Sequence, residues 1–262
     1  MPDPPLPAPF RWEGGHIVAD LPGGRVLFST RRGGVSPGPF ASLNLGRLTA
    51  DDGGNVDENR ERLAAAVGLP RARFLYGCQV HGATVRRASE WHLPRPEASP
   101  ADASPERAAT EEDGQATALG DAAALVFVAD CLPVLLVAEG AVAALHGGWR
   151  GLAGGIVGEG VAALRELGIG GPIAAAVGPG ARGCCYEVGQ EVHAVFADVP
   201  GARFGARNLD LPTVAARRLD EAGVDAVHDT GLCTLCADGG LFFSHRRDAG
   251  VTGRQAGVAW RT

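Results

Sequence analysis

The sequence AAALVFVADCLPVLLVAEGAVAALH, residues 122–146, indicates how the chain folds. It contains three apolar runs, at 124–128, 133–137 and 142–145, with Asp130 after the first and Glu139 after the second. Short apolar runs bounded by turn residues are typical of strands that are buried on both faces. The two carboxylates also leave no uninterrupted apolar stretch of about 18 residues, so the segment does not predict a membrane span. We therefore expect three buried strands here.

The flanking sequence mixes helices with further strands. The pattern predicts helices at 55–67, 152–167 and 211–222, with Asn55 as the N-cap of the first. Further strands are predicted at 26–29, 74–76, 173–177, 224–228 and 241–244. Helices and strands do not alternate regularly, which favours an α+β fold with mixed sheets over a doubly wound parallel sheet. We expect a single layered domain over 1–262, with helices flanking the sheets and a mobile insertion at about 94–112, which is rich in Pro, Ala, Ser and acidic residues.

The composition is that of an ordinary globular protein. Of the 262 residues, 45% are apolar and 21% are charged, and the formal net charge is −6. No basic run stands out, so neither nucleic acid nor an anionic membrane is an expected partner. The first residues lack the organisation of a signal peptide, so we expect a cytoplasmic protein whose six cysteines are mostly reduced thiols or metal ligands. No apolar surface stripe is evident, and a monomer is the default expectation.

Two histidines share a local pattern that suggests a metal site. His81 and His146 each follow a short apolar run and precede a glycine, which places each imidazole at a strand end. Cys131 lies in the turn between two predicted strands, where it could be a zinc ligand or a packed core thiol. Two imidazoles and one thiolate suit zinc and leave a fourth position open. Their spacing of 50 and 15 residues is not diagnostic by itself.

Several arginines lie in or beside glycine-rich turns and could form an anion pocket, because guanidinium binds phosphate in a bidentate manner. For any one of them a surface salt bridge is the alternative. Arg150 is singled out because it lies four residues after His146, and Arg31 is the second candidate.

Four further cysteines form two pairs, Cys184 with Cys185 and Cys233 with Cys236. A structural zinc held by four thiolates is one interpretation, but an adjacent pair is a poor geometry for two ligands of one tetrahedral ion. A redox dithiol lacks the expected βαβ context. We interpret the four as packing or pocket-lining residues.

The chain resembles the YfiH-type "laccase domain" family, which is associated with purine nucleoside phosphorylase activity. The matching motifs occur in one order along nearly the whole chain: FSTRRGG (28–34), SLNLG (42–46), QVHG (79–82), ADCLPV (129–134), HGGWRG (146–151), GCCYEVG (183–189), CTLC (233–236) and FFSHRRD (242–248). The resemblance implies the family's layered α+β fold, similar to that of Cys–His toxin deamidases. It also implies zinc bound by His81, Cys131 and His146.

The resemblance further implies phosphorolysis of adenosine, inosine and methylthioadenosine, with adenosine deamination as a second activity and phosphate as co-substrate. Ser29 and Asn44 are polar neighbours of Arg31 in the family pattern. His245 is a core histidine or a partner that orients a zinc-bound histidine, and Glu187 is a general acid/base or an ion-pair partner. These residues, with Arg150, are the expected catalytic and substrate-binding set.

Two alternatives stay open, a cysteine hydrolase and a non-catalytic binding protein, and a further one is argued against. A four-copper oxidase is disfavoured, because the chain has seven histidines, no His-x-His pair and Met1 as its only methionine, although copper could still occupy the His₂Cys site. A cysteine hydrolase would use Cys131 as nucleophile and His81 or His146 as base, without a metal. A zinc-stabilised, non-catalytic binding protein in cell-wall precursor quality control is the third hypothesis.

Overall fold

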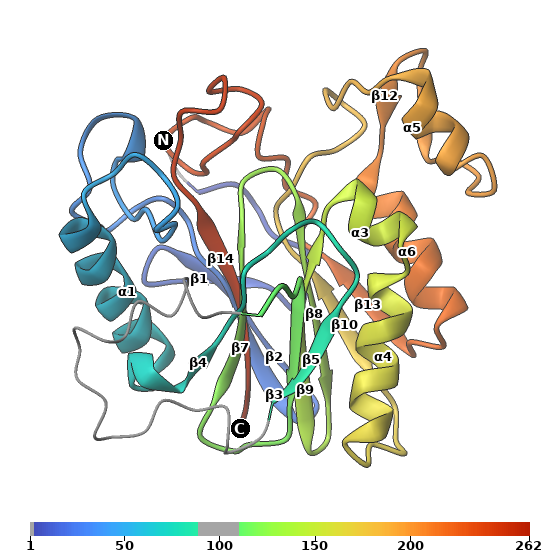
Figure 1. Ribbon diagram of the computed structural model, residues 1–262, viewed down its shortest axis with the longest axis horizontal. Helices are drawn as coiled ribbons and strands as arrows, with labels where there is room; N and C mark the ends of the chain where they lie inside the picture. The colour runs from blue at the N-terminus through green and yellow to red at the C-terminus, as the bar shows by residue number, and fades with distance from the viewer. Residues whose placement is uncertain (1–2, 89–109) are drawn as a thin grey trace.

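A computed structural model describes residues 3–88 and 110–262 and shows four layers, helix, sheet, sheet and helix (Figure 1). Within these residues the strands form two six-stranded mixed sheets, in the orders β1-β2-β3-β14-β7-β4 and β13-β10-β8-β9-β6-β5, and a two-stranded ribbon, β11-β12. Most neighbours are antiparallel, while β10–β13, β4–β7 and β5–β6 are parallel. The α+β prediction, with mixed sheets flanked by helices, is confirmed.

The strands of the first sheet are β1 (Arg11–Glu13), β2 (His16–Leu21), β3 (Gly24–Phe28), β4 (Phe74–Leu75), β7 (Ala123–Val128) and β14 (Gln255–Arg261). Those of the second are β5 (Val85–Ala88), β6 (Gly114–Thr117), β8 (Leu132–Ala138), β9 (Ala141–Gly147), β10 (Ala174–Val177) and β13 (Ala226–Asp229), and the ribbon is β11 (Arg203–Phe204) and β12 (Asn208–Leu209). The helices are α1 (Gly53–Val67), α3 (Trp149–Ala153), α4 (Ile156–Glu166), α5 (Gln190–Val195) and α6 (Leu211–Glu221), with 3₁₀ turns at Gly38–Phe40 and Arg71–Arg73.

The segment 122–146 supplies the centre of both sheets, as its apolar runs predict. Strand β8 is buried along its whole length, because its side chains alternate between two cores. Val134 and Leu136 face the helices, whereas Leu135 and Val137 face the first sheet. Phe28 of the first sheet belongs to the same core as Leu135 and Val137, so the two sheets are packed directly against each other.

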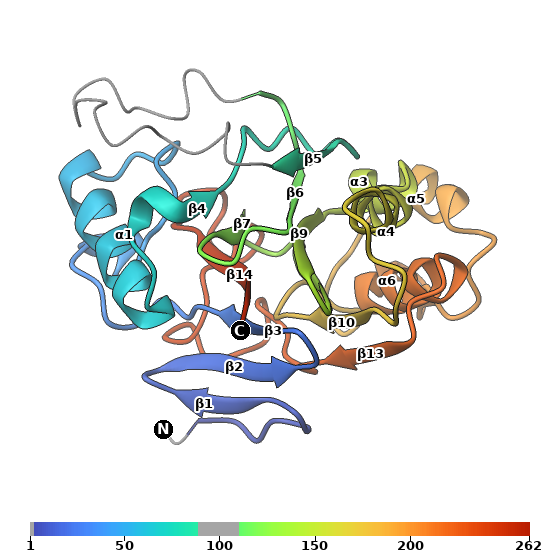
Figure 2. The ribbon, with the colours of Figure 1, turned by 90° about the horizontal axis from the view of Figure 1, so that it is seen from below.

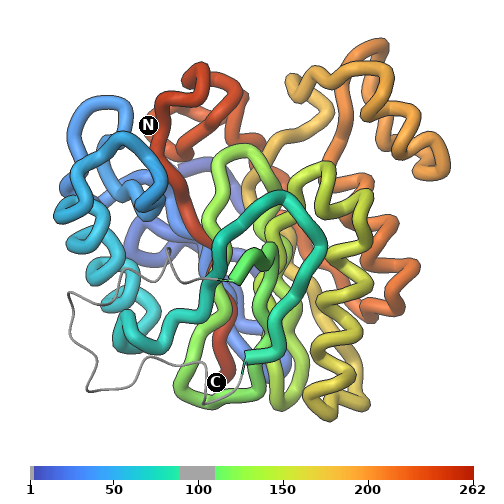
Figure 3. The backbone as a smooth tube through the Cα atoms, in the orientation of Figure 1, coloured from blue at the N-terminus to red at the C-terminus, as the bar shows by residue number. Residues whose placement is uncertain are grey.

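Helices cover the two outer faces. Leu63 and Val67 of α1 pack on the first sheet, while α4 and α6 cover the second, as Figure 2 shows from another direction. The turn between β7 and β8 and the chain that leads into β14 lie at the same end of the strands (Figure 3). This shared end gathers loops that are distant in the sequence.

Three local predictions were wrong. Asp52, not Asn55, caps α1, because its carboxylate accepts from the N–H groups of Gly54 and Asn55. The helix predicted at 152–167 is broken in two at Gly154 and Gly155, the latter with φ +89°. The predicted strand at 241–244 is a buried loop.

In that loop, the backbone N–H and carbonyl of Phe243 form hydrogen bonds with a side chain, in place of a neighbouring strand. The Phe243 N–H donates to Gln255 Oε1 at 2.8 Å, and Gln255 Nε2 donates to the Phe243 carbonyl at 3.1 Å. The apolar pattern of these residues reflects burial alone.

Most of the predicted insertion, 94–109, lies outside the described residues. Its last three residues are held to the loop before β5: the Cys78 N–H donates to Thr110, and the Glu112 N–H donates back to Cys78. No helix in 3–88 or 110–262 is long and apolar enough to cross a membrane.

The inter-sheet core makes a stability prediction. Leu135→Ala removes a fully buried side chain and should lower the free energy of unfolding by about 2–5 kcal/mol. Leu48→Ala is the matched control, because Leu48 is 81% exposed and its truncation should cost no more than about 0.5 kcal/mol. Urea denaturation measures both, and equal effects would contradict the assigned core.

Candidate metal centre and substrate pocket

The structure brings His81, Cys131 and His146 together. Their nearest ligand atoms all lie within 4.8 Å of one another, and the two imidazole centroids are 4.7 Å apart. Donors on one tetrahedral zinc lie about 3.3–3.6 Å apart, so small side-chain movements would close the site. His81 is exposed and His146 is buried, so one side of the group faces open space. The three donors therefore fit an open zinc site.

The buried carboxylate of Asp113 organises this site. Its Oδ1 accepts from His146 Nδ1 at 2.7 Å and from the His81 N–H at 2.9 Å, and its Oδ2 accepts from the N–H groups of Val80 and Gly82 at 3.1 and 2.7 Å. Because a carboxylate can only accept, His146 Nδ1 carries the hydrogen and Nε2 is left for a metal. The same bonds hold His81 in a left-handed conformation, with φ +63°.

Cys131 and His146 shift each other's pKa. Burial opposes ionisation of the thiol, but the imidazoles of His146 and His81 outweigh it and lower the pKa of Cys131 to about 6. Burial also opposes protonation of His146, but the Cys131 thiolate and Asp113 outweigh it and raise the pKa of His146 to about 9. Without a metal, the pair at neutral pH is a thiolate and an imidazolium.

The turn that carries Cys131 is fixed from two sides. Asp130 has a φ of +83°, its carboxylate accepts from the Thr234 hydroxyl at 2.6 Å and from the Arg246 N–H at 2.7 Å, and its carbonyl accepts from Ala181. Across the site, Gly148 leaves the necessary space. A Cβ there would lie 3.0 Å from Cys131 Sγ and 3.3 Å from His81 Cδ2, so a side chain would displace two of the three ligands.

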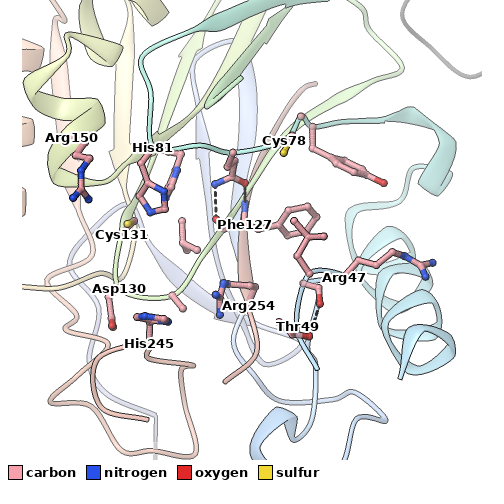
Figure 4. Close-up of a pocket in the computed structure, with 18 of the residues that line it drawn as sticks. Arg47, Thr49, Cys78, His81, Phe127, Asp130, Cys131, Arg150, His245 and Arg254 are labelled. Atoms are coloured by element: carbon pink, nitrogen blue, oxygen red, sulfur yellow. Dashed lines mark hydrogen bonds between the residues drawn. The ribbon is translucent and has the colours of Figure 1, made fainter. Parts of the chain in front are cut away.

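A pocket of about 440 Å³ extends from the three ligands, a volume typical of small-molecule sites. In Figure 4, His81, Cys131 and Arg150 lie at one end, Phe127, Cys78 and Arg47 at the other. Tyr76 and Phe127 form an edge-to-face pair with centroids 5.3 Å apart. The Gln79 amide fastens this wall by donating to the Phe127 carbonyl and accepting from its N–H, both at 2.8 Å.

The pocket is cationic although the chain is acidic. Among the described residues its lining includes a single carboxylate, Asp130, and five arginines: Arg47, Arg60, Arg150, Arg246 and Arg254. Arg150 stacks on Trp149 with its guanidinium carbon 4.4 Å from the ring centroid. Arg246 stacks on Tyr186 and donates to the Glu187 carbonyl, and Arg254 donates to two backbone carbonyls. None of these last three arginines forms an ion pair with a carboxylate in the described residues.

The structure separates the predicted substrate residues into two groups. Arg150 and His245 line the pocket. The others lie outside its lining: Ser29 accepts from the Ala256 N–H, Arg31 donates to the carbonyls of Ala41 and Gly239, and Glu187 pairs with Arg207. Asn44 is buried behind the wall, where its side-chain Oδ1 accepts from the Arg254 backbone N–H at 2.9 Å.

Sequence reasoning missed Asp113, Asp130 and Arg60, whereas it counted Arg254 among the arginines beside glycine-rich turns without singling it out. Asp113 directly follows the acidic insertion, so in the sequence it is not distinguishable from the acidic residues of that insertion. Asp130 lies in the ADCLPV motif, which was the signal that could have found it. Arg60 and Arg254 come from distant segments, and only the fold brings them to one pocket.

Of the other four cysteines, Cys233 alone is buried in the core. None of them is among the described pocket-lining residues, and Cys184 and Cys236 are exposed, which excludes core packing for them. The four sulfur atoms instead lie within 4.8 Å of one another.

The Cys131–His146 pair predicts the pH dependence of metal binding. A metal-bound imidazole must lose its proton, so zinc affinity should rise about tenfold per pH unit from about pH 6 to the His146 pKa of about 9, then level off. Below about pH 6 the thiol also binds a proton, and the slope should steepen. Competition with a chelator measures this profile.

Cys131→Ser is the control for that profile. It removes one of the three candidate ligands, so zinc should bind more weakly at every pH. It also removes the thiolate that raises the pKa of His146, so the plateau should begin at a lower pH. Affinity that stays constant in the wild type between pH 7 and 9 would contradict the assigned ion pair.

Comparison with known proteins adds to this geometry. A family model described as multi-copper polyphenol oxidoreductase laccase matches residues 25–262. A purine nucleoside phosphorylase of Corynebacterium glutamicum is 38% identical over 244 residues, which cover 90% of this chain and 94% of that protein. A purine nucleoside phosphorylase of Pseudomonas aeruginosa is 37% identical over 248 residues, covering 90% and 93%.

Solved structures agree over the same length. YlmD from Geobacillus stearothermophilus matches with a TM-score of 0.85 at 33% identity, covering 97% of this chain and 99% of that one. YfiH from Bacillus licheniformis matches with a TM-score of 0.83 at 27% identity, covering 97% and 100%. From the match to its model over most of the length, the chain belongs to the family described as multi-copper polyphenol oxidoreductase laccase, the laccase-domain family.

Proposed function

We propose that the protein is a zinc-dependent purine nucleoside phosphorylase of the cytoplasm, acting on adenosine, inosine and methylthioadenosine, with adenosine deamination as a second activity. One observation carries the proposal: an open His₂Cys group and three arginines without carboxylate partners among the described residues share one pocket. The names of the relatives support the same reaction. The six free cysteines fit a reducing compartment.

The arginines account for the phosphate. In phosphorolysis a phosphate oxygen bonds to C1′ of the ribose as the bond from C1′ to the purine nitrogen breaks, and the leaving base takes up a proton. Arg150 lies beside His81 and Cys131 in Figure 4, and Arg254 points toward the middle of the pocket. Guanidinium groups that face a pocket with one carboxylate can hold a phosphate dianion next to a developing oxocarbenium ion.

The opposite end of the pocket suits a purine. Tyr76 and Phe127 present flat apolar surfaces, and the Arg60 guanidinium lies 5.2 and 4.8 Å from their centroids. His245 lines the same pocket, and no described residue forms a hydrogen bond with its ring nitrogens. We assign His245, which lies next to Asp130 in Figure 4, to substrate contact in the part of the pocket near Cys131.

The donor set at the other end suits zinc, which when bound would supply Lewis acidity there. Deamination would exchange the 6-amino group of adenosine for a water oxygen and release ammonia, with the base bound in a second orientation that turns it toward the metal end of the pocket. The family description mentions copper, but the described residues contain one mixed His/Cys group and one all-cysteine group. That inventory does not match the histidine-rich clusters of a four-copper oxidase.

Arg150→Ala tests the phosphate assignment. It should raise the KM for phosphate or lower kcat/KM by about 10- to 100-fold, because a hydrogen bond to a charged group contributes about 1.5–3 kcal/mol. The KM for nucleoside should change less. Steady-state assays that follow adenine release from adenosine at varied phosphate measure both constants.

Arg217→Ala is the matched control. Arg217 lies on α6 and pairs with Glu221 in the next turn, outside the pocket, so its kinetics should equal those of the wild type. An Arg150→Ala enzyme with wild-type phosphate kinetics would contradict the assigned phosphate site.

A second function is favoured by one specific observation. A cysteine hydrolase would also fit this arrangement, with Cys131 as nucleophile, His146 as base and Asp113 as the group that orients the base. The lowered pKa of Cys131 is that of a reactive thiol. Such a hydrolase would act without a metal. The three residues alone do not distinguish the two functions.

Metal removal distinguishes them. The zinc phosphorylase should lose all turnover on dialysis against a chelator and regain it when zinc is added back. Iodoacetamide should alkylate Cys131 faster in the metal-free protein than in the loaded one, because a bound metal would shield the thiolate. A metal-free protein with full activity, abolished by alkylation at Cys131, would establish the hydrolase. Loaded, folded protein without turnover would favour the non-catalytic binding protein.

A further inference from the structure

The two remaining cysteine pairs meet at the ends of two neighbouring strands. Strands β10 and β13 are parallel, with Val177 opposite Asp229. Beyond these strand ends the two segments of the chain stay side by side, since the Gly180 N–H donates to the Leu232 carbonyl and the Thr234 N–H donates to the Gly180 carbonyl. Each chain then turns and presents two cysteines: Cys184 and Cys185 on one turn, Cys233 and Cys236 on the other.

The sulfur atoms form a compact group. The distances are 3.6 Å for Cys184–Cys185, 3.3 Å for Cys184–Cys236, 3.4 Å for Cys185–Cys233 and 3.0 Å for Cys185–Cys236. A disulfide requires about 2.05 Å, and all four are free thiols. Four thiolates on a zinc ion with bonds of about 2.3 Å lie about 3.8 Å apart. Shifts below about 1 Å would therefore reach that geometry.

Adjacent cysteines do not prevent this arrangement here. The turn at 183–185 directs both sulfur atoms to the opposite turn, as shown by the contacts of Cys184 with Cys236 and of Cys185 with Cys233. Because Cys184 and Cys236 are exposed, apolar packing does not explain why four polarisable thiols converge. Tetrahedral all-thiolate groups are typical of zinc.

We propose that Cys184, Cys185, Cys233 and Cys236 form a second, structural zinc site. The site is separate from the His₂Cys centre and does not depend on the reaction proposed above. Zinc binding would release the thiol protons and cross-link the two turns.

The cross-link would fix the walls of the pocket. Thr234 lies between the ligands Cys233 and Cys236, and its hydroxyl donates to the Asp130 carboxylate at 2.6 Å, one residue before Cys131. Tyr186 follows Cys185 directly and lines the pocket. The carbonyl of Thr234 also accepts from Arg247, in the loop that carries His245. The second site thus positions three parts of the pocket without contacting substrate.

Metal analysis of the purified full chain tests the proposal. The wild type should contain two zinc ions per chain, the double variant Cys233→Ser/Cys236→Ser one, and Cys131→Ser one. Cys78→Ser is the matched control, since Cys78 belongs to neither group, and it should keep two. A wild type with one zinc that disappears in Cys131→Ser and persists in the double variant would overturn the proposal.

X-ray absorption at the zinc edge of the wild type keeps the test valid if the double variant does not fold. The two sites together contain five sulfur ligands, so the mean number of sulfur ligands per zinc should be about 2.5, at a Zn–S distance of about 2.3 Å. A mean of about one sulfur per zinc would show the His₂Cys site alone. Two disulfides among the four cysteines, detected by mass spectrometry without reductant, would equally overturn the site.

Discussion

The site depends on one buried carboxylate. Asp113 is fully buried, and it is compensated by four hydrogen bonds, three from backbone N–H groups and one from His146. Burial opposes its ionisation, but the hydrogen bond from His146 and those from the backbone outweigh burial and lower the pKa of Asp113. The Asp113 carboxylate therefore has two effects. It orients the imidazole of His146, and it stabilises the left-handed backbone conformation of His81.

The two-sheet core supplies the rigid frame for this interaction. The turn with Asp130 and Cys131 links β7 of one sheet to β8 of the other, and His146 lies in β9, next to β8. His81 comes from the loop before β5 and is brought to the same point by Asp113. The rest of the pocket lining comes from loops, from the end of β7 and from α1 and α3. Scaffold and site thus have different origins: apolar alternation builds the first, and a few buried charges assemble the second.

Sequence was most informative where burial alone decides the structure. The runs in 122–146 predicted three central strands, because each alternates between two cores. The same logic failed at 241–244, where the Gln255 side chain satisfies a buried loop. Strand β14 was not predicted, although it pairs with both β3 and β7.

The site was predicted only in part, for a related reason. The three candidate ligands were predicted from motifs, whereas Asp113 was missed because its partners His81 and His146 are distant from it in the sequence. The objection to a four-cysteine group assumed an isolated adjacent pair, but parallel strands bring a second turn opposite the first.

The zinc affinity of Asp113→Asn tests the central claim most directly. Asparagine keeps the side-chain volume, but in either orientation its amide NH₂ faces hydrogen-bond donors from which the carboxylate accepts in the wild type. We expect the zinc affinity of the His₂Cys site to fall about 10- to 100-fold, as it does when other residues that orient a metal ligand are replaced. Asp121→Asn, on a side chain that is 60% exposed, should bind zinc as the wild type does. Equal affinity in Asp113→Asn and Asp121→Asn would contradict the claim that Asp113 assembles the site.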